Sequence, residues 1–175
     1  NRQYLESLAK GATNSRKYVL LGTNKDDSLQ LNLEDKIRDD LLNAPLPTSS
    51  SIWRDRFCRV IIVEDADYPG YCRLIWRTHV KELTDLPAAQ RAHCMRVVFA
   101  VEQALRRVFN PDKVNLASFG NMVPHLHWHI MPRFNGDAHF PDPVWAKRRR
   151  GKTKADARIP VKWRSLLKSQ LAQLL

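Results

Sequence analysis

Three histidines stand at every second position of one apolar run, where residues 124–133 read PHLHWHIMPR. Alternate side chains of an extended strand point to the same side. The run therefore predicts a strand over residues 124–131 with His125, His127 and His129 on one face, about 6.6 Å apart per step. Buried imidazoles need hydrogen-bond partners that a sheet ladder does not supply, so the run indicates a functional site rather than a core strand.

Two chemistries fit three imidazoles on one strand. An alternating pair of histidines together with a third ligand can bind zinc. Alternatively, one ring can act as the nucleophile on an electrophilic phosphorus while the other two assist it. The spacing of the histidines does not separate these two interpretations, so both stay open at this point.

The run resembles the signature of the histidine triad family, in which three histidines are each followed by an apolar residue. Two other stretches extend the resemblance. Residues 68–80, YPGYCRLIWRTHV, are similar to the hairpin that precedes the long helix in these proteins. Residues 120–123, GNMV, stand where a Gly-Gln-Ser/Thr-Val segment leads into the triad. The resemblance covers residues 51–145 and does not include residues 1–47.

The resemblance implies an α+β domain with a five-stranded antiparallel sheet and one long helix, which pairs as a homodimer through the sheet and the helix. It also implies a nucleotide hydrolase or nucleotidyl transferase that acts on a purine nucleotide and requires no metal or other cofactor. The substrate is either a nucleoside phosphoramidate, as for a phosphoramidase, or a dinucleoside polyphosphate such as a diadenosine polyphosphate. The sequence does not choose between cleavage of a P–N bond and of a P–O–P bond.

The resemblance also assigns roles to the three histidines. The middle one, His127, attacks the α-phosphorus and forms a nucleotidyl-imidazole intermediate, which water then hydrolyses. His125 and His129 are expected to donate hydrogen bonds to the phosphate oxygens and to hold the attacking ring in its correct tautomer. Covalent catalysis of this kind splits one difficult displacement into two easier ones.

Further residues are expected to bind the substrate by the same resemblance. Asn115 matches a family position that contacts phosphate, and Asn121 lies in the segment that leads into the triad. The acid or amide that binds the ribose falls near Glu64 or Asp65.

Two positions depart from the family pattern. Tyr71 stands where many members have a histidine, and its phenol can replace one hydrogen bond to the substrate but not the charge of an imidazolium. Met122 stands where a serine or threonine commonly assists the leaving group, and it has no donor. These departures leave open a nucleotide- or RNA-binding protein with a weakly active triad. A zinc-dependent hydrolase that uses the three histidines is a further alternative.

The chain is strongly basic, with a formal net charge of +11, and its most basic stretch is residues 147–154, KRRRGKTK. Clustered lysine and arginine attract phosphates, so nucleotides and RNA are both suitable partners. The stretch lacks the interleaved aromatic residues of a single-strand binding surface. We therefore interpret it as a solvated loop and treat nucleic-acid binding as secondary.

We expect residues 48–175 to form one catalytic domain with a basic loop over residues 147–154 and a C-terminal helix. Residues 1–47 form an N-terminal extension of unknown role, expected to hold two helices and a short apolar stretch. The boundary falls in a linker rich in proline and serine, residues 45–51. The longest aliphatic or aromatic run, residues 97–101, is far too short to span a bilayer. The chain is therefore expected to be cytoplasmic, with no membrane partner.

Four runs rich in β-branched and aromatic residues predict strands, over residues 57–63, 71–77, 114–119 and 124–131. A long helix is predicted from a cap at Thr84 or Asp85, with Pro87 in its first turn, to Val108. A final amphipathic helix is predicted over residues 161–171.

The remaining cysteines and histidines are not expected to form sites. The three cysteines, odd in number and without a Cys-x-x-Cys pair, argue against disulfides and a structural zinc site. Some histidine triad proteins carry a Cys-x-x-Cys near Cys58, but Asp55 occupies its first place in this chain. His79 is expected to end a strand, His93 to lie on a helix surface and His139 to lie in a loop.

Overall fold

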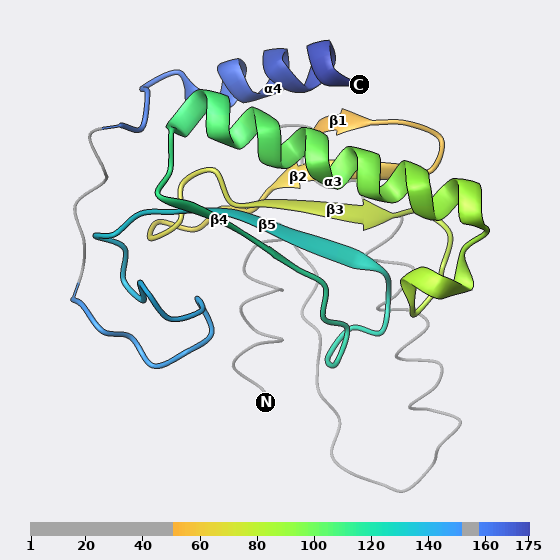
Figure 1. Cartoon of the computed structure of the whole chain (residues 1–175), viewed down its shortest axis with the longest axis horizontal. Coiled ribbons are helices and arrows are strands. Elements are labelled where there is room, and N and C mark those ends of the chain that lie inside the picture. The colour runs from red at the N-terminus through yellow and green to blue at the C-terminus, as the bar shows by residue number, and fades with distance from the viewer. Residues whose placement is uncertain (1–50, 152–157) are drawn as a thin grey trace, which may run out of the picture. The chain divides into compact units, whose positions relative to one another are not determined.

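The computed structural model describes residues 51–151 and 158–175, and its centre is a five-stranded antiparallel sheet (Figure 1). The strand order is β1-β2-β3-β5-β4. The strands are β1 Ser51–Arg54, β2 Cys58–Ile62, β3 Cys72–Trp76, β4 Lys113–Ala117 and β5 His127–Arg133. The predicted α+β class is confirmed. Four strands overlap the predicted runs, and the fifth, β1, begins at the last residue of the predicted linker.

Two helices cover one face of this sheet (Figure 1). α3, Ala88–Phe109, lies across the face, and α4, Trp163–Leu174, packs against α3 and β1. The core beneath them is built from alternate strand residues, of which Val60, Leu74 and Ile130 are fully buried. Because neighbouring residues of a strand point to opposite sides, the residues between these core positions lie on the other face.

The long helix begins later than its capping residues predicted. The residue that caps α3 is Pro87, and the preceding residues Leu83–Asp85 form a separate 3₁₀ turn. The Asp85 carboxylate accepts a hydrogen bond from the backbone N–H of Glu82 and so serves this turn rather than α3. The assignment of Thr84 or Asp85 as the cap of the long helix was therefore wrong. α4 likewise begins at Trp163, and Val161 before it is fully exposed.

The histidine strand also begins later than predicted. β5 starts at His127, so His125 lies before the strand and only two of the three histidines belong to it. The physical reason is a tight turn around Pro124, in which the N–H of His125 donates to the carbonyl of Val123 at 2.8 Å. An N–H that is used in a turn cannot also pair in the sheet.

All three cysteines are free and buried, as expected of a chain without disulfides. Among the residues that the structure describes, no helix has the length and apolar character needed to cross a membrane. The predictions for residues 1–47, including two helices and an apolar stretch, lie outside the described residues.

Candidate active site

His127 and His129 lie on the sheet face opposite α3, which we call the triad face. Strand register sets their neighbours, because β5 pairs with β3 on one side and with β4 on the other. Ile75 of β3 lies opposite His127, and Arg73 lies opposite His129. The two imidazole rings meet edge to face with their centroids 4.8 Å apart. The alternation read from the sequence thus places two of the three rings side by side.

The ring of His127 is held in one tautomer by the backbone. Its Nδ1 lies 2.7 Å from the carbonyl oxygen of His125, and a carbonyl oxygen can only accept, so Nδ1 carries the proton. Burial lowers the pKa of His127, outweighing the opposite effect of this hydrogen bond, and the positive charge of Arg73 lowers it further. A neutral ring with its proton on Nδ1 presents an unprotonated Nε2, which is the atom a nucleophile needs.

His129 is held by a side chain instead. The Tyr71 hydroxyl is hydrogen-bonded to its Nδ1. Burial, followed by the charges of Arg73 and His127, lowers the pKa of His129 to about 3. The ring is therefore neutral near pH 7, and when the tyrosine O–H donates to Nδ1 the ring proton sits on Nε2. His129 can then donate one hydrogen bond to a phosphate oxygen. Tyr71 can thereby orient this donor, and its direct contact with the substrate stays a prediction.

His125 makes different contacts from the other two histidines. Its Nε2 lies 2.6 Å from the carbonyl oxygen of Trp76, and its Nδ1 lies 3.2 Å from Nδ1 of His79. The rings of His79 and His125 are stacked, with their centroids 5.4 Å apart. His125 thus ties the entry of β5 to the end of β3, and its own carbonyl fixes the His127 tautomer. His79 does not end a strand as predicted, because β3 stops at Trp76 and the His79 ring lies beyond it against His125.

Arg73 is the residue of the triad face that the sequence analysis missed. Its guanidinium carbon lies 5.6 Å from the centroid of the Tyr71 ring, and Nη2 makes a weak 3.5 Å contact with the hydroxyl. Within the described residues its Nε is buried and has no hydrogen-bond partner. A positive charge beside neutral imidazoles favours an anion. The available signal was a charged residue at an alternate position of an otherwise apolar strand, between Cys72 and Leu74.

Asn115 also lies on the triad face, opposite Met131. Its Oδ1 accepts a hydrogen bond from Nη1 of Arg133 at 2.5 Å. Arg133 is almost completely buried and also donates to both carboxylate oxygens of Asp137, at 2.6 and 3.0 Å. With Oδ1 engaged, the amide N–H groups of Asn115 are the part of this side chain that can donate to a phosphate.

The predicted ribose-binding acids are engaged elsewhere. Glu64 accepts two hydrogen bonds from Arg164 of α4, at 2.6 and 2.8 Å, and the two residues line a cavity of about 430 Å³. The Asp65 carboxylate accepts from the backbone N–H of Asp67 at 2.9 Å. Asn121 is exposed in the turn between β4 and β5. Within the described part of the chain, the hydrogen bonds of Glu64 and Asp65 go to residues outside the triad, so the roles of these two side chains and of Asn121 stay predictions.

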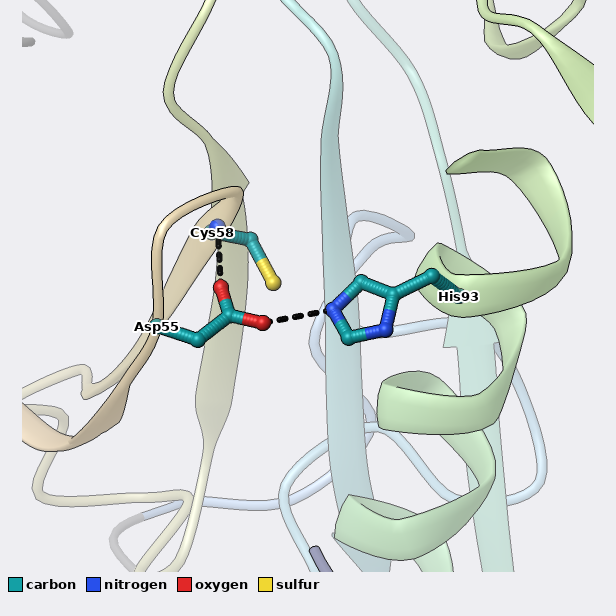
Figure 2. A group of neighbouring side chains, drawn as sticks. All are labelled: Asp55, Cys58 and His93. Carbon is teal, nitrogen blue, oxygen red and sulfur yellow. Dashed lines mark hydrogen bonds and ion pairs between the residues drawn. The ribbon is translucent and has the colours of Figure 1, made fainter. Parts of the chain in front are cut away.

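A second cluster, which we call the turn–helix cluster, joins the β1–β2 turn to α3 and consists of Asp55, Cys58 and His93 (Figure 2). His93 is not the surface residue that was predicted, because its side chain is only 14% exposed and its Nε2 lies 2.6 Å from Asp55 Oδ2. Arg96 donates to the other ring nitrogen at 2.7 Å, so the ring proton sits on Nε2. The second Asp55 oxygen accepts from the backbone N–H groups of Phe57 and Cys58, both at 2.8 Å.

The ligand types of the turn–helix cluster are those that zinc accepts, but among the described residues three of them gather here, one fewer than a structural zinc site uses. The nitrogen that faces the cluster holds a proton, and Asp55 accepts that proton in a hydrogen bond. Burial raises the pKa of the Cys58 thiol, and the nearby Asp55 and Cys94 raise it further, so sulfur stays protonated. In this state the Asp55–His93 hydrogen bond and the contact between the Phe57 and His93 rings fasten the β1–β2 turn to α3. Three ligands leave the set for a structural zinc ion incomplete.

A five-stranded antiparallel sheet with one long helix and alternating histidines on a central strand defines a histidine triad domain. The HIT domain family matches residues 47–136, which is just over half of the chain, and the chain belongs to this family. Its fold is similar to the crystal structure of a histidine triad protein from Bradyrhizobium japonicum, with 34% identity and a TM-score of 0.59. That match covers 69% of this chain and 89% of the other.

Two curated relatives have named activities. An AP-4-A phosphorylase of Mycobacterium tuberculosis is 30% identical over 78 residues, which is 41% of this chain and 40% of that protein. An asymmetrical bis(5'-nucleosyl)-tetraphosphatase of Schizosaccharomyces pombe is 30% identical over 84 residues, 45% of this chain and 46% of that protein. The chain spans less than half the length of these curated relatives.

Proposed function

We propose that this chain is a nucleotide hydrolase or nucleotidyl transferase that acts at the α-phosphate of a dinucleoside polyphosphate, with His127 as the nucleophile. Family membership supports a nucleotide substrate, and the two curated relatives are named for dinucleoside tetraphosphate substrates. The observation that carries the mechanism is the hydrogen bond from Nδ1 of His127 to the His125 carbonyl, which leaves Nε2 unprotonated.

The first step is a displacement at phosphorus. Nε2 of His127 attacks the α-phosphorus and forms a P–N bond, while the P–O bond to the remaining polyphosphate breaks and that oxygen departs with the electron pair. The ring becomes a cationic nucleotidyl-imidazole that still carries its Nδ1 proton. In the second step water attacks the same phosphorus, the P–N bond breaks, and the water proton passes to solvent.

Two groups are suited to stabilise the charge that develops on the phosphate oxygens. His129 supplies an N–H donor whose orientation Tyr71 fixes, and Arg73 supplies a permanent positive charge. Positioned donors of this kind act without reorganisation during the reaction. Arg73 thereby offsets the charge that is lost where Tyr71 replaces a histidine.

The alternative of a zinc-dependent hydrolase is not supported by the geometry. Among the described residues, the metal-ligating side chains that lie close enough to share an ion are those of the turn–helix cluster, not the triad. We accordingly propose that turnover requires no metal or other cofactor. RNA binding also gains no support from the described part of the basic stretch, because Arg148 and Arg149 are paired with Asp67 and Asp142.

We further propose a homodimer formed through the sheet and α3. Phe99 on α3 is exposed and lines a surface groove with Met95 and Leu174, which gives this helix an apolar surface for a second copy. Sedimentation equilibrium of the full chain measures the oligomeric state, and a monomer at all concentrations contradicts this proposal.

The nucleophile is tested by trapping the intermediate. Diadenosine tetraphosphate labelled at its α-phosphates is mixed with the full-length protein and quenched rapidly, and we expect an acid-labile, alkali-stable label on the protein. His127→Asn should abolish the label and lower kcat by several orders of magnitude, whereas His129→Asn should cost roughly 10²–10³-fold. The matched control is His139→Asn, at a loop histidine bonded to Tyr68, which should turn over normally. Near wild-type turnover by His127→Asn contradicts the mechanism.

A further inference from the structure

Two large aromatic side chains stand exposed beside the triad. Phe119, just beyond the end of β4, and Trp145, far along the chain, meet edge to face with ring centroids 4.6 Å apart. Both also contact the His129 ring, Trp145 at 5.4 Å and Phe119 at 5.8 Å between centroids. Half of each side chain is exposed, 52% for Phe119 and 51% for Trp145. We call these two residues the aromatic pair.

The aromatic pair is unlike the other aromatic residues of this domain, which mostly pack in the core. Trp76 and Phe109, for example, are buried beneath α3 and α4. Exposing two aromatic rings at one place leaves apolar surface in water, and such a surface indicates a binding role when it adjoins a site. Aromatic rings in this setting bind planar groups by stacking, and nucleobases stack on them whatever their sequence.

The basic stretch holds Trp145 in place. Arg148 makes a bidentate ion pair with Asp67, at 2.6 and 3.1 Å, and Arg150 donates to the carbonyls of Asp137 and Phe140. The backbone of the stretch also bonds to the preceding loop, since two successive N–H groups donate to the carbonyl of Ala138. The prediction that residues 147–154 form a merely solvated loop thus misses these contacts. The described arginines fasten the segment that carries Trp145.

We propose that the aromatic pair is a stacking subsite for the nucleobase of the departing nucleotide, so that the site prefers dinucleoside polyphosphates to phosphoramidates with small leaving groups. This inference rests on the proposed function. The exposure of the pair favours the departing nucleoside, because that group must leave after the first step. The transferred nucleotide, by contrast, stays bound through both steps. A phosphoramidate with a small amine has no ring to stack there.

The test compares two substrates that differ in whether the far end of the tetraphosphate carries a nucleoside. Diadenosine tetraphosphate carries a second adenosine, and adenosine 5'-tetraphosphate does not. A stacked base contributes roughly a five- to hundred-fold preference. We therefore expect the wild type to have a higher kcat/KM for diadenosine tetraphosphate than for adenosine 5'-tetraphosphate. The Phe119→Leu/Trp145→Leu double variant should lose most of this ratio. The ratio is the readout, because a loss transmitted through the contacts of the pair with His129 lowers kcat/KM for both substrates alike. Leu166→Ala, a truncation at an exposed apolar residue of α4 away from the aromatic pair, is the control and should keep the wild-type ratio.

Two further measurements separate the possible failures. An unchanged ratio in the double variant overturns the subsite. Inhibition by AMP gives a second test of the subsite. If the double variant loses the same factor in its affinity for AMP as in its kcat/KM for diadenosine tetraphosphate, the pair holds the transferred nucleoside, and the proposed subsite is overturned. If the wild type turns over neither substrate, the proposed function fails, and equilibrium binding of the same two compounds tests the subsite alone. Arg148→Met should lower the ratio in part, since it loosens the segment that carries Trp145.

Discussion

His129→Asn should make the protein more resistant to mild acid than the wild type. In the folded state burial holds the pKa of His129 near 3, with smaller contributions from Arg73 and His127. In the unfolded state the ring titrates near 6.5. The unfolded state therefore binds more protons below pH 6.5, and the folded state loses stability as the pH falls from 6.5 toward 3.

The size of the effect follows from the two pKa values. Each pH unit in which only the unfolded state is protonated costs about 1.4 kcal/mol. Between pH 7 and pH 5 the loss from His129 sums to about 2 kcal/mol of unfolding free energy. Asparagine does not titrate, and its side-chain oxygen can accept the Tyr71 hydroxyl in place of Nδ1. The variant should thus lose about 2 kcal/mol less than the wild type over this interval.

The assay is urea unfolding of the full chain, followed by far-UV circular dichroism at pH 7 and at pH 5. The comparison uses the difference between the two pH values within each protein, so a general destabilisation by the substitution cancels. The pKa of His127 is also lowered, and its contribution stays in both proteins. Arg73→Met should give an intermediate result, because it removes one of the lesser causes of the shift. Equal pH dependence in the wild type and His129→Asn would refute this reasoning.

Three other outcomes are expected. Asp137→Asn should lower the unfolding free energy by about 3–5 kcal/mol, measured by urea unfolding, because it leaves the buried Arg133 charge unpaired, whereas Asp67→Asn at an exposed ion pair should cost far less. Arg73→Met should lower kcat/KM at least tenfold and move the acid limb of its pH profile to higher pH, because removing a positive charge raises the pKa of His127. Dialysis against EDTA should leave Tm and turnover unchanged, and one equivalent of zinc bound to the turn–helix cluster by elemental analysis would contradict this.

Patterns that are local in the sequence predicted their elements well. The β-branched and aromatic residues of the runs 57–63 and 71–77 predicted β2 and β3, since such side chains pack well on a pleated sheet. The apolar repeat ending at Val108 predicted α3, because its helical spacing places these side chains on the face that packs on the sheet. The start of β5 was misplaced, because the N–H of His125 donates to the Val123 carbonyl in a turn around Pro124. The alternation of the histidines does not reveal this turn.

Contacts between residues that lie far apart in the sequence could not be predicted from it. Trp145 lies 26 positions after Phe119, and their meeting depends on ion pairs such as Arg148–Asp67, which join segments about 80 residues apart. Arg73 was not predicted as a site residue, because a charged residue in a strand is usually solvated. Only the pairing of β3 with β5 reveals that it lies opposite His129.

The hydrogen bond between His127 and the His125 carbonyl also governs how long the covalent intermediate lasts. A carbonyl is a poor base and cannot take the Nδ1 proton, so the nucleotidyl-imidazole keeps its positive charge. A cationic imidazole is a better leaving group than a neutral one, and the P–N bond stays open to attack. A carboxylate in the place of this carbonyl would quench the charge and lengthen the life of the adduct. The acceptor belongs to the main chain, so no side-chain substitution at position 125 removes it.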